Sequence, residues 1–454
     1  MFLKKVISTL VLTLIAASLG AHDDLHASDI GDHEAGPTPV TLTIEDALAL
    51  ALEKNPEIVA ERYRQKATSS GVGQAFANLL PSINAEASVS HQENTQIVSS
   101  TLFGESFTER NDFDLDQTNA SIRAEQVLFD GFQSLNAIRE AQARREAGAS
   151  ALKGVEQNIL FQTALMFITH VRDEKILNTL QASLRAHIEQ VRQAEARFNG
   201  GVTTITDVSQ AKARLAAARA NLARGRAAHS QSKAELTALV GHFDQLLSPD
   251  NIDLPIPTTF DLALAQARST APSLLEFEAL ARASEKRAKS AKGRFSPTIS
   301  AFASYRVADE PSIFTDQDQE LVYGLRASVP IFQGGLRFAR VKEATSLARE
   351  DRARLIAQER GLIARLTVLW SAISEAEIRV IAAGEQASAN ELALEGVVAE
   401  ANSGLRATID ILNAENEYAL SLTEIARADA DLLIARYRLL SEIGVLAVPV
   451  DPEN

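Results

Sequence analysis

Two short stretches of the chain place an aspartate beside the start of a predicted helix. GGVTTITDV (200–208) and SGLRATIDI (403–411) align at a separation of 203 residues, so that Asp207 corresponds to Asp410. A carboxylate can form a directional, bidentate ion pair with an arginine. The same carboxylate also suits the first turn of a helix, where it accepts hydrogen bonds from backbone N–H groups. The residues leave both interpretations of Asp207 open.

No pattern in the sequence predicts catalysis or a cofactor. The GxSxG, HExxH and phosphate-loop motifs are absent, and the eight histidines are scattered. The lack of cysteine excludes disulfides, thiolate chemistry, cysteine-based metal sites and a lipidated N-terminal cysteine. His22, His26 and His33 lie among acidic residues, but their spacing matches no defined metal site. We expect no enzyme activity, no cofactor and no defined metal site; weak metal binding by this His/Asp-rich segment stays open.

Composition narrows the class of protein further. The net charge of −14 argues against a nucleic-acid partner, because phosphate binding requires a basic surface. Aromatic residues make up only 5% of the chain and alanine is abundant, which favours long, closely packed helices.

The N-terminus has the features of an export signal. Lys4 and Lys5 precede an apolar run over 6–17, and small residues follow over 18–21, as at a cleavage site. The apolar run is short for a transmembrane helix. We expect residues 1–21 to be a signal peptide and 22–40 to be a disordered linker, so that the mature chain is exported.

The elements that position the two aspartates are helices with a 3.5-residue period. From Val208 and from Ile411, small or apolar residues recur in steps of three and four over about thirty residues, which is the seam of a coiled coil. An ordinary antiparallel helical bundle has a similar period, and the period alone does not exclude it.

Four segments alternate between apolar and polar residues. We predict strands near 82–98, 113–129, 297–308 and 320–331. Such alternation is typical of a transmembrane β-barrel, but a soluble sheet with one wet face shows it too. The export signal, the lack of cysteine and the coiled-coil segments favour the outer membrane. Four strands cannot close a barrel, so several copies of the chain would have to share one.

The two halves of the chain share one plan: helix, two strands, then long helices. At a separation of 203 residues Gly131 falls on Gly334, and before the second strand of each half the separation is 216, which places Pro81 on Pro297. The longer loop between the strands of the first half accounts for the difference. We predict two repeats over 41–246 and 258–445, a linker over 247–257 and a tail over 446–454.

The order of these motifs resembles the TolC family of outer-membrane efflux and secretion ducts, over roughly residues 41–445. The resemblance rests on LTIEDALALALEKNPEI, LLPSINAEASVS, QVLFDGF with its copy VPIFQGG, and the pair GGVTTITDV and SGLRATIDI. It implies an α+β membrane protein in which three protomers each lend four strands to a twelve-stranded β-barrel. A long periplasmic α-helical coiled-coil barrel continues from it.

The resemblance also implies a function. Such a homotrimer is a passive exit duct in outer-membrane lipid, with a large periplasmic part. A periplasmic adaptor (membrane fusion) protein and an inner-membrane ABC or proton-driven transporter open it, for type I protein secretion or multidrug efflux. The passenger stays open, although the missing lipidation cysteine slightly favours secretion.

The same resemblance assigns a periplasmic gate to the two repeated stretches. It implies that Asp207 pairs with Arg406. Thr206 matches one half of a second latch, but Ala401 stands where the family has the partner tyrosine. Gly201 and Gly404 are the glycines of the two helix-to-helix turns at the tip.

An acidic constriction is a further implication of the resemblance. Of the family's two acidic positions, Asp410 matches one and the other falls on Asn413, so we expect one acidic ring.

A soluble periplasmic coiled-coil scaffold or adaptor is the alternative from another class. Periplasmic adaptors usually begin with a lipoyl-like β domain, for which the sequence shows no run of strands. Solubility without detergent would distinguish the two.

Overall fold

The described part of the chain divides into two compact units. The computed structural model describes residues 41–102, 105–243, 245–246, 254–312, 315–403 and 405–447. Of these, one unit holds residues 71–141 and 285–346, and the other holds 41–70, 142–284 and 347–447. The expected signal peptide and linker, the end of the tail and Gly404 lie outside the described residues.

The helices come in pairs of equal length, one member in each half of the chain. The pairs are α2 (Ile44–Lys54) and α6 (Phe260–Thr270) with 11 residues, α3 (Pro56–Ala77) and α7 (Pro272–Gly293) with 22, α4 (Gln133–Asn199) and α8 (Leu336–Asn402) with 67, and α5 (Ile205–Val240) and α9 (Thr408–Ile443) with 36. These equal lengths support the tandem repeat, which stays a proposal.

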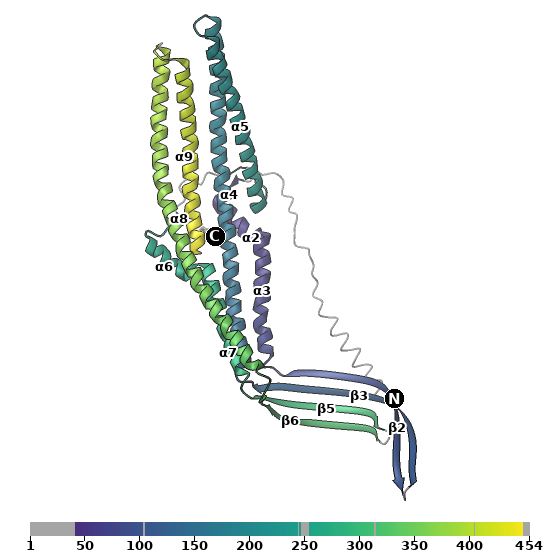
Figure 1. Ribbon diagram of the computed structural model, residues 1–454. Helices are drawn as coiled ribbons and strands as arrows, with labels where there is room; N and C mark the ends of the chain where they lie inside the picture. Colours follow the sequence, from purple (N-terminus) through teal and green to yellow (C-terminus); the bar gives the residue numbers. More distant parts are fainter. Residues whose placement is uncertain are drawn as a thin grey trace. The chain divides into compact units, whose positions relative to one another are not determined.

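The first unit contains one antiparallel sheet (Figure 1). Its strands are β2 (Ser82–Leu102), β3 (Glu105–Phe129), β5 (Thr298–Ser312) and β6 (Thr315–Ser328), in the order β2-β3-β5-β6. The first and last strands of this order are therefore edges, each with one row of backbone groups that has no strand partner within the described residues.

The two hairpins of this sheet have equivalent registers. Ser82 pairs with Glu125 in the first hairpin, and Thr298 pairs with Ser328 in the second. The first members of these pairs are 216 residues apart and the second members 203 apart, which are the separations found between the two halves of the sequence.

All four strands differ from the predicted ranges, and in the second hairpin the third strand runs to Ser312 and the fourth begins at Thr315. The first runs to Leu102 and the second begins at Glu105, so the hairpin continues through a polar stretch without apolar alternation. A cross-strand polar contact accompanies this continuation: the Thr95 hydroxyl donates to a carboxylate oxygen of Asp112 at 2.7 Å. The last strand ends at Ser328 rather than 331, before Pro330, which has no N–H to donate.

The core of the second unit lies where the short helices pack against the long ones. Leu48 of α2 and Phe167 of α4 are almost fully buried in one cluster, and Ala263 of α6 packs with Leu366 of α8 in another. Burial of such a large side chain contributes about 1.5–3 kcal/mol. The two-residue strands β1 (Thr41–Leu42) and β4 (Gln245–Leu246) pair in parallel.

Gln157 clamps the segment that follows α9 to the same core. Its side-chain amide donates to the carbonyl oxygen of Leu446 at 2.7 Å and accepts from the backbone N–H of Leu446 at 3.0 Å. Ser441 also donates its hydroxyl to the backbone carbonyl of Gln157, at 2.9 Å.

The long helices form two hairpins, α4 with α5 and α8 with α9 (Figure 1). The predicted coiled-coil seam of α5 is buried at six of its positions: Val208, Ala211, Ala218, Leu222, Ser232 and Leu236. Their burial confirms the predicted seam. Among the described residues, no helix combines the length and the apolar character needed to cross a bilayer.

Candidate functional site at the hairpin turns

The turn between α4 and α5 is fixed by hydrogen bonds to Asp207. Gly201 has a φ of 72°, a left-handed conformation that favours glycine. The carboxylate of Asp207 accepts from the Thr203 hydroxyl and from the N–H and hydroxyl of Thr204, at 3.0 and 2.9 Å for the latter two. The N–H of Asp207 donates to the Thr204 hydroxyl, which completes a capping box at the start of α5. These bonds, chiefly that from Thr203, lower the pKa of Asp207.

The turn between α8 and α9 is built differently. At the positions of Thr203 and Thr204 it carries Arg406 and Ala407, and the N-cap residue Ala407 makes no side-chain hydrogen bond. The guanidinium of Arg406 instead donates from Nε to a carboxylate oxygen of Glu400 at 2.7 Å. Both side chains are about half exposed, so the pair contributes little stability.

Each member of the Asp207–Arg406 pair implied by the resemblance therefore has a partner on its own turn. Asp207 acts as a helix cap, which was the other interpretation of its carboxylate. Thr206 is exposed on the first turn of α5. The link between Asp207 and Arg406 stays a prediction, and it requires Arg406 to leave Glu400.

One hydrogen bond joins the two hairpins near their turns. The guanidinium of Arg214 on α5 donates from Nη2 to Oδ1 of Asn413 on α9, at 2.7 Å. The family resemblance places Asn413 where relatives have an acidic residue. In this structure its side-chain oxygen accepts a hydrogen bond from the Arg214 guanidinium. Arg214 was not predicted as a site residue, because no motif in the sequence indicates that it contacts Asn413, 199 positions away.

A buried polar cluster lies where α4 and α9 meet. Nδ1 of His187 lies 3.1 Å from Oε1 of Gln190, and both residues are buried. Glu415 of α9 faces His187, and burial raises the pKa of its carboxyl group. The amide nitrogen of Gln190 and one carboxylate oxygen of Glu415 are buried and have no hydrogen-bond partner. Such unpaired buried groups weaken the packing of α9 on α4.

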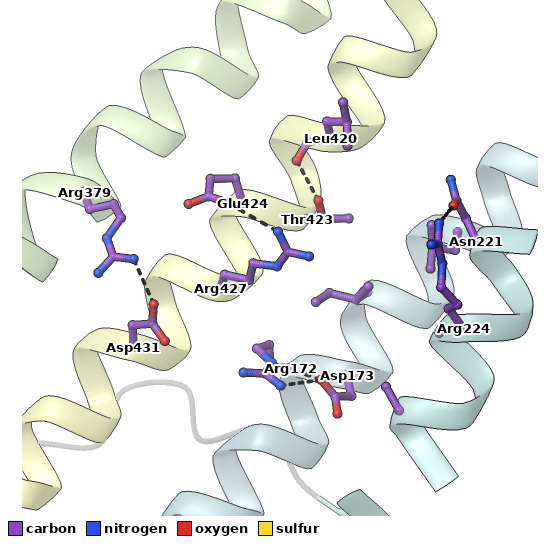
Figure 2. Close-up of a pocket in the computed structure, with 14 residues that line it drawn as sticks. Arg172, Asp173, Asn221, Arg224, Arg379, Leu420, Thr423, Glu424, Arg427 and Asp431 are labelled. Atoms are coloured by element: carbon purple, nitrogen blue, oxygen red, sulfur yellow. Dashed lines mark hydrogen bonds and ion pairs between the residues drawn. The ribbon is translucent and has the colours of Figure 1, made fainter. Parts of the chain in front are cut away.

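Further from the turns, the two hairpins line an open pocket of about 820 Å³ whose lining includes several charged side chains (Figure 2). The ion pairs around it stay within a hairpin. Arg172 pairs with Asp173 on α4, and Arg379 of α8 pairs with Asp431 of α9 at 2.9 Å. At this level the hairpins are thus separated by space rather than joined by a packed apolar interface.

Comparison with known proteins agrees with this architecture. The family model described as "Outer membrane efflux protein" matches residues 47–242 and 263–445. The outer membrane efflux protein BepC of Brucella suis is 27% identical over 410 residues, which cover 90% of this chain and 87% of that protein. Outer membrane protein TolC of Escherichia coli is 23% identical and covers 86% and 80%.

Solved structures show the same fold. CusC has a TM-score of 0.76 at 14% identity, covering 90% of this chain and 95% of its own. VceC of Vibrio cholerae has a TM-score of 0.75 at 18% identity, covering 88% and 96%. The resemblance to the TolC family is confirmed, and the chain belongs to the outer membrane efflux protein family.

Proposed function

We propose that this chain is a passive outer-membrane exit duct, through which a periplasmic adaptor and an inner-membrane transporter export their passenger. Family membership supports the outer-membrane location and favours the duct over the soluble scaffold. Relatives are named both for efflux, as BepC is, and for the secretion of a protease, as AprF of Pseudomonas aeruginosa is. The proposal therefore covers polypeptide and small-molecule passengers.

The observation that carries the proposal is the exposure of apolar side chains on the sheet. Ile83 and Val89 of β2 are 70% and 76% exposed, and Leu325 of β6 is 72% exposed. These side chains alternate with polar ones along each strand, as lipid-facing and lumen-facing residues do in a barrel. In water such an exposed apolar surface is unfavourable and promotes aggregation, whereas in a bilayer it faces apolar lipid chains.

The open edges of the sheet set the assembly. An unpaired sheet edge is not tolerated in hydrocarbon, and one copy supplies four strands. Three copies, the number that the family resemblance implies, close a twelve-stranded barrel. We propose this homotrimer as the working form.

The hairpin turns are the proposed periplasmic gate, formed by the predicted residues Asp207, Thr206, Arg406, Asp410 and Asn413 with the turn glycines Gly201 and Gly404. The hydrogen bond between Arg214 and Asn413 supports this proposal because it ties one hairpin to the other close to their ends. An exposed polar contact of this kind is weak. A weak contact, repeated in each copy, suits a gate that a partner protein opens.

The test is the conductance of the purified protein in planar bilayers. We expect small, cation-selective openings from the wild type and larger or longer openings from Arg214→Ala and from Asn413→Ala. Arg219→Ala, an exposed arginine on the same helix, is the matched control and should resemble the wild type. Asp207→Ala and Arg406→Ala test the link between these two residues in the same way. A protein that stays soluble without detergent and forms no pore would support the scaffold instead.

A further inference from the structure

The end of α7 next to the sheet carries positive charge that its counterpart in the first half lacks. Over 285–294 the chain has five cations and one acid: Lys286, Arg287, Lys289, Lys292 and Arg294, with Glu285. The equivalent stretch, 216 residues earlier over 69–78, has no charged residue. Because α3 and α7 have the same length, the fold itself does not require these cations.

The two helices that flank α7 belong to the same chain. On one side, the Ser290 hydroxyl donates to the backbone carbonyl of Gln133 at the start of α4, at 3.3 Å. On the other side, the Ser284 hydroxyl donates to the carboxylate of Asp351 on α8. The remaining two sides of α7 therefore do not lie between copies of the chain. In a duct, one of them faces the lumen and the other faces outwards.

Lys289 and Lys292 lie on the outward side of α7. Leu274, near the start of α7, is buried with Ala263 of α6, and α6 cannot occupy the lumen of an open duct. Lys292 follows Leu274 by eighteen residues, which are five full turns, so the two side chains leave the helix in the same direction. Lys289 lies about 60° from this direction, whereas Arg287 lies about 140° from it.

The charges of these two lysines are not neutralised by an ion pair within the described part of the chain, and both side chains are exposed. Arg282, two turns earlier on α7, is different: it pairs with Glu146 at 2.8 Å and with Glu278 at 3.7 Å. The two lysines are thus available to an external anion.

Exposed apolar side chains lie between the lysines and the sheet. The rings of Phe295 and Phe338 are 5.1 Å apart and are 42% and 73% exposed. Val329, directly after β6, is 54% exposed and continues the apolar face to which Leu325 belongs. Aromatic and basic residues at the end of an apolar surface are typical of the interface between a membrane and water.

The two lysines are also at the right height for lipid headgroups. Lys289 lies four residues before Gly293, the last residue of α7, which corresponds to about 6 Å along the helix. The headgroup layer on each side of the hydrocarbon core is about 5–8 Å thick. With the apolar face of the sheet in hydrocarbon, both ammonium groups reach this layer.

We propose that Lys289 and Lys292 bind the phosphate of an anionic phospholipid, such as phosphatidylglycerol, in the leaflet of the outer membrane that faces the periplasm. Lysine binds phosphate as a point charge, and basic residues beside a membrane attract anionic lipids. Each copy supplies one such pair, because the end of α3 has no cation. This inference rests on the proposed duct, because it requires the sheet to lie in the membrane.

Native mass spectrometry of the purified protein tests the inference. Phosphatidylglycerol and phosphatidylethanolamine are added at equal concentration, and the molecules of each lipid that stay bound are counted. We expect the wild type to retain phosphatidylglycerol in preference. Each basic residue beside an anionic surface strengthens binding about fivefold. The double variant Lys289→Gln with Lys292→Gln should therefore retain at least about tenfold less phosphatidylglycerol.

The matched control is Arg287→Gln with Arg294→Gln, which removes the same charge from the other side of the same segment. It should retain phosphatidylglycerol as the wild type does. Lys289→Arg with Lys292→Arg keeps both charges and should also retain it.

Three results would overturn the inference. The first is unchanged retention in the lysine-to-glutamine variant, and the second is an equal loss in the arginine-to-glutamine control. The third is displacement of the lipid by inorganic phosphate but not by chloride of the same ionic strength, which would indicate a site for free anions. A wild-type protein that forms no pore in planar bilayers refutes the proposed duct itself, which is a separate outcome.

Discussion

Replacing Gly131 by alanine should destabilise the fold where the first-half strands meet the long helix. Gly131 has a φ of 69°, and a left-handed conformation costs a residue with a Cβ about 1–2 kcal/mol. The new Cβ would also lie 2.4 Å from the Gly293 carbonyl oxygen and 2.5 Å from the Ser296 Cβ. Relieving this overlap requires the backbone to shift, at about 1–3 kcal/mol. The expected total is about 2–5 kcal/mol.

The assay is urea unfolding in detergent, followed by far-UV circular dichroism and by the fraction of trimer. Gly201→Ala is the matched control, because Gly201 has a φ of 72° with no atom within 4 Å of the added Cβ. Gly201→Ala should lose only the stability that the left-handed conformation costs, about 1–2 kcal/mol. If Gly131→Ala unfolds at the same urea concentration as Gly201→Ala, the close approach of the two backbones does not constrain the fold.

Two further changes probe the core and the hairpin seam. Gln157→Leu leaves the buried N–H and C=O of Leu446 unpaired, at about 1–3 kcal/mol each. It should lower the urea midpoint far more than the exposed control Gln231→Leu, and equal midpoints would argue against the clamp. Burial raises the pKa of Glu415 above its ordinary 4.5, so packing of α9 on α4 weakens as pH rises through the raised pKa. Wild-type openings should then become more frequent with rising pH in that range, and the same rise in Glu415→Gln would contradict this cause.

The order of helices and strands could be predicted from the sequence because apolar residues recur at regular spacings in both halves of the chain. Apolar alternation located the strands, and the separations of 203 and 216 residues correspond to the registers of the two hairpins. The continuation of the first hairpin over 99–102 and 105–112 was missed because its strands are held by backbone pairing without an apolar face.

The candidate site was predicted less completely. The sequence allowed Asp207 to be a helix cap or a gate residue, and only the geometry shows the bonds from Thr203 and Thr204. The contact of Arg214 with Asn413 depends on how two helices meet in space, and that of Glu400 with Arg406 depends on the conformation of a single turn. Each of these contacts involves single residues of common types, so no periodic pattern in the sequence predicts it.

Native mass spectrometry of the detergent-extracted mature protein tests the central claim, that copies of this chain close one barrel through the free edges of β2 and β6. We expect a species of three chains that forms pores when added to planar bilayers. A single chain that forms the same pores without assembling would contradict it, because four strands with two open edges cannot enclose a channel in lipid.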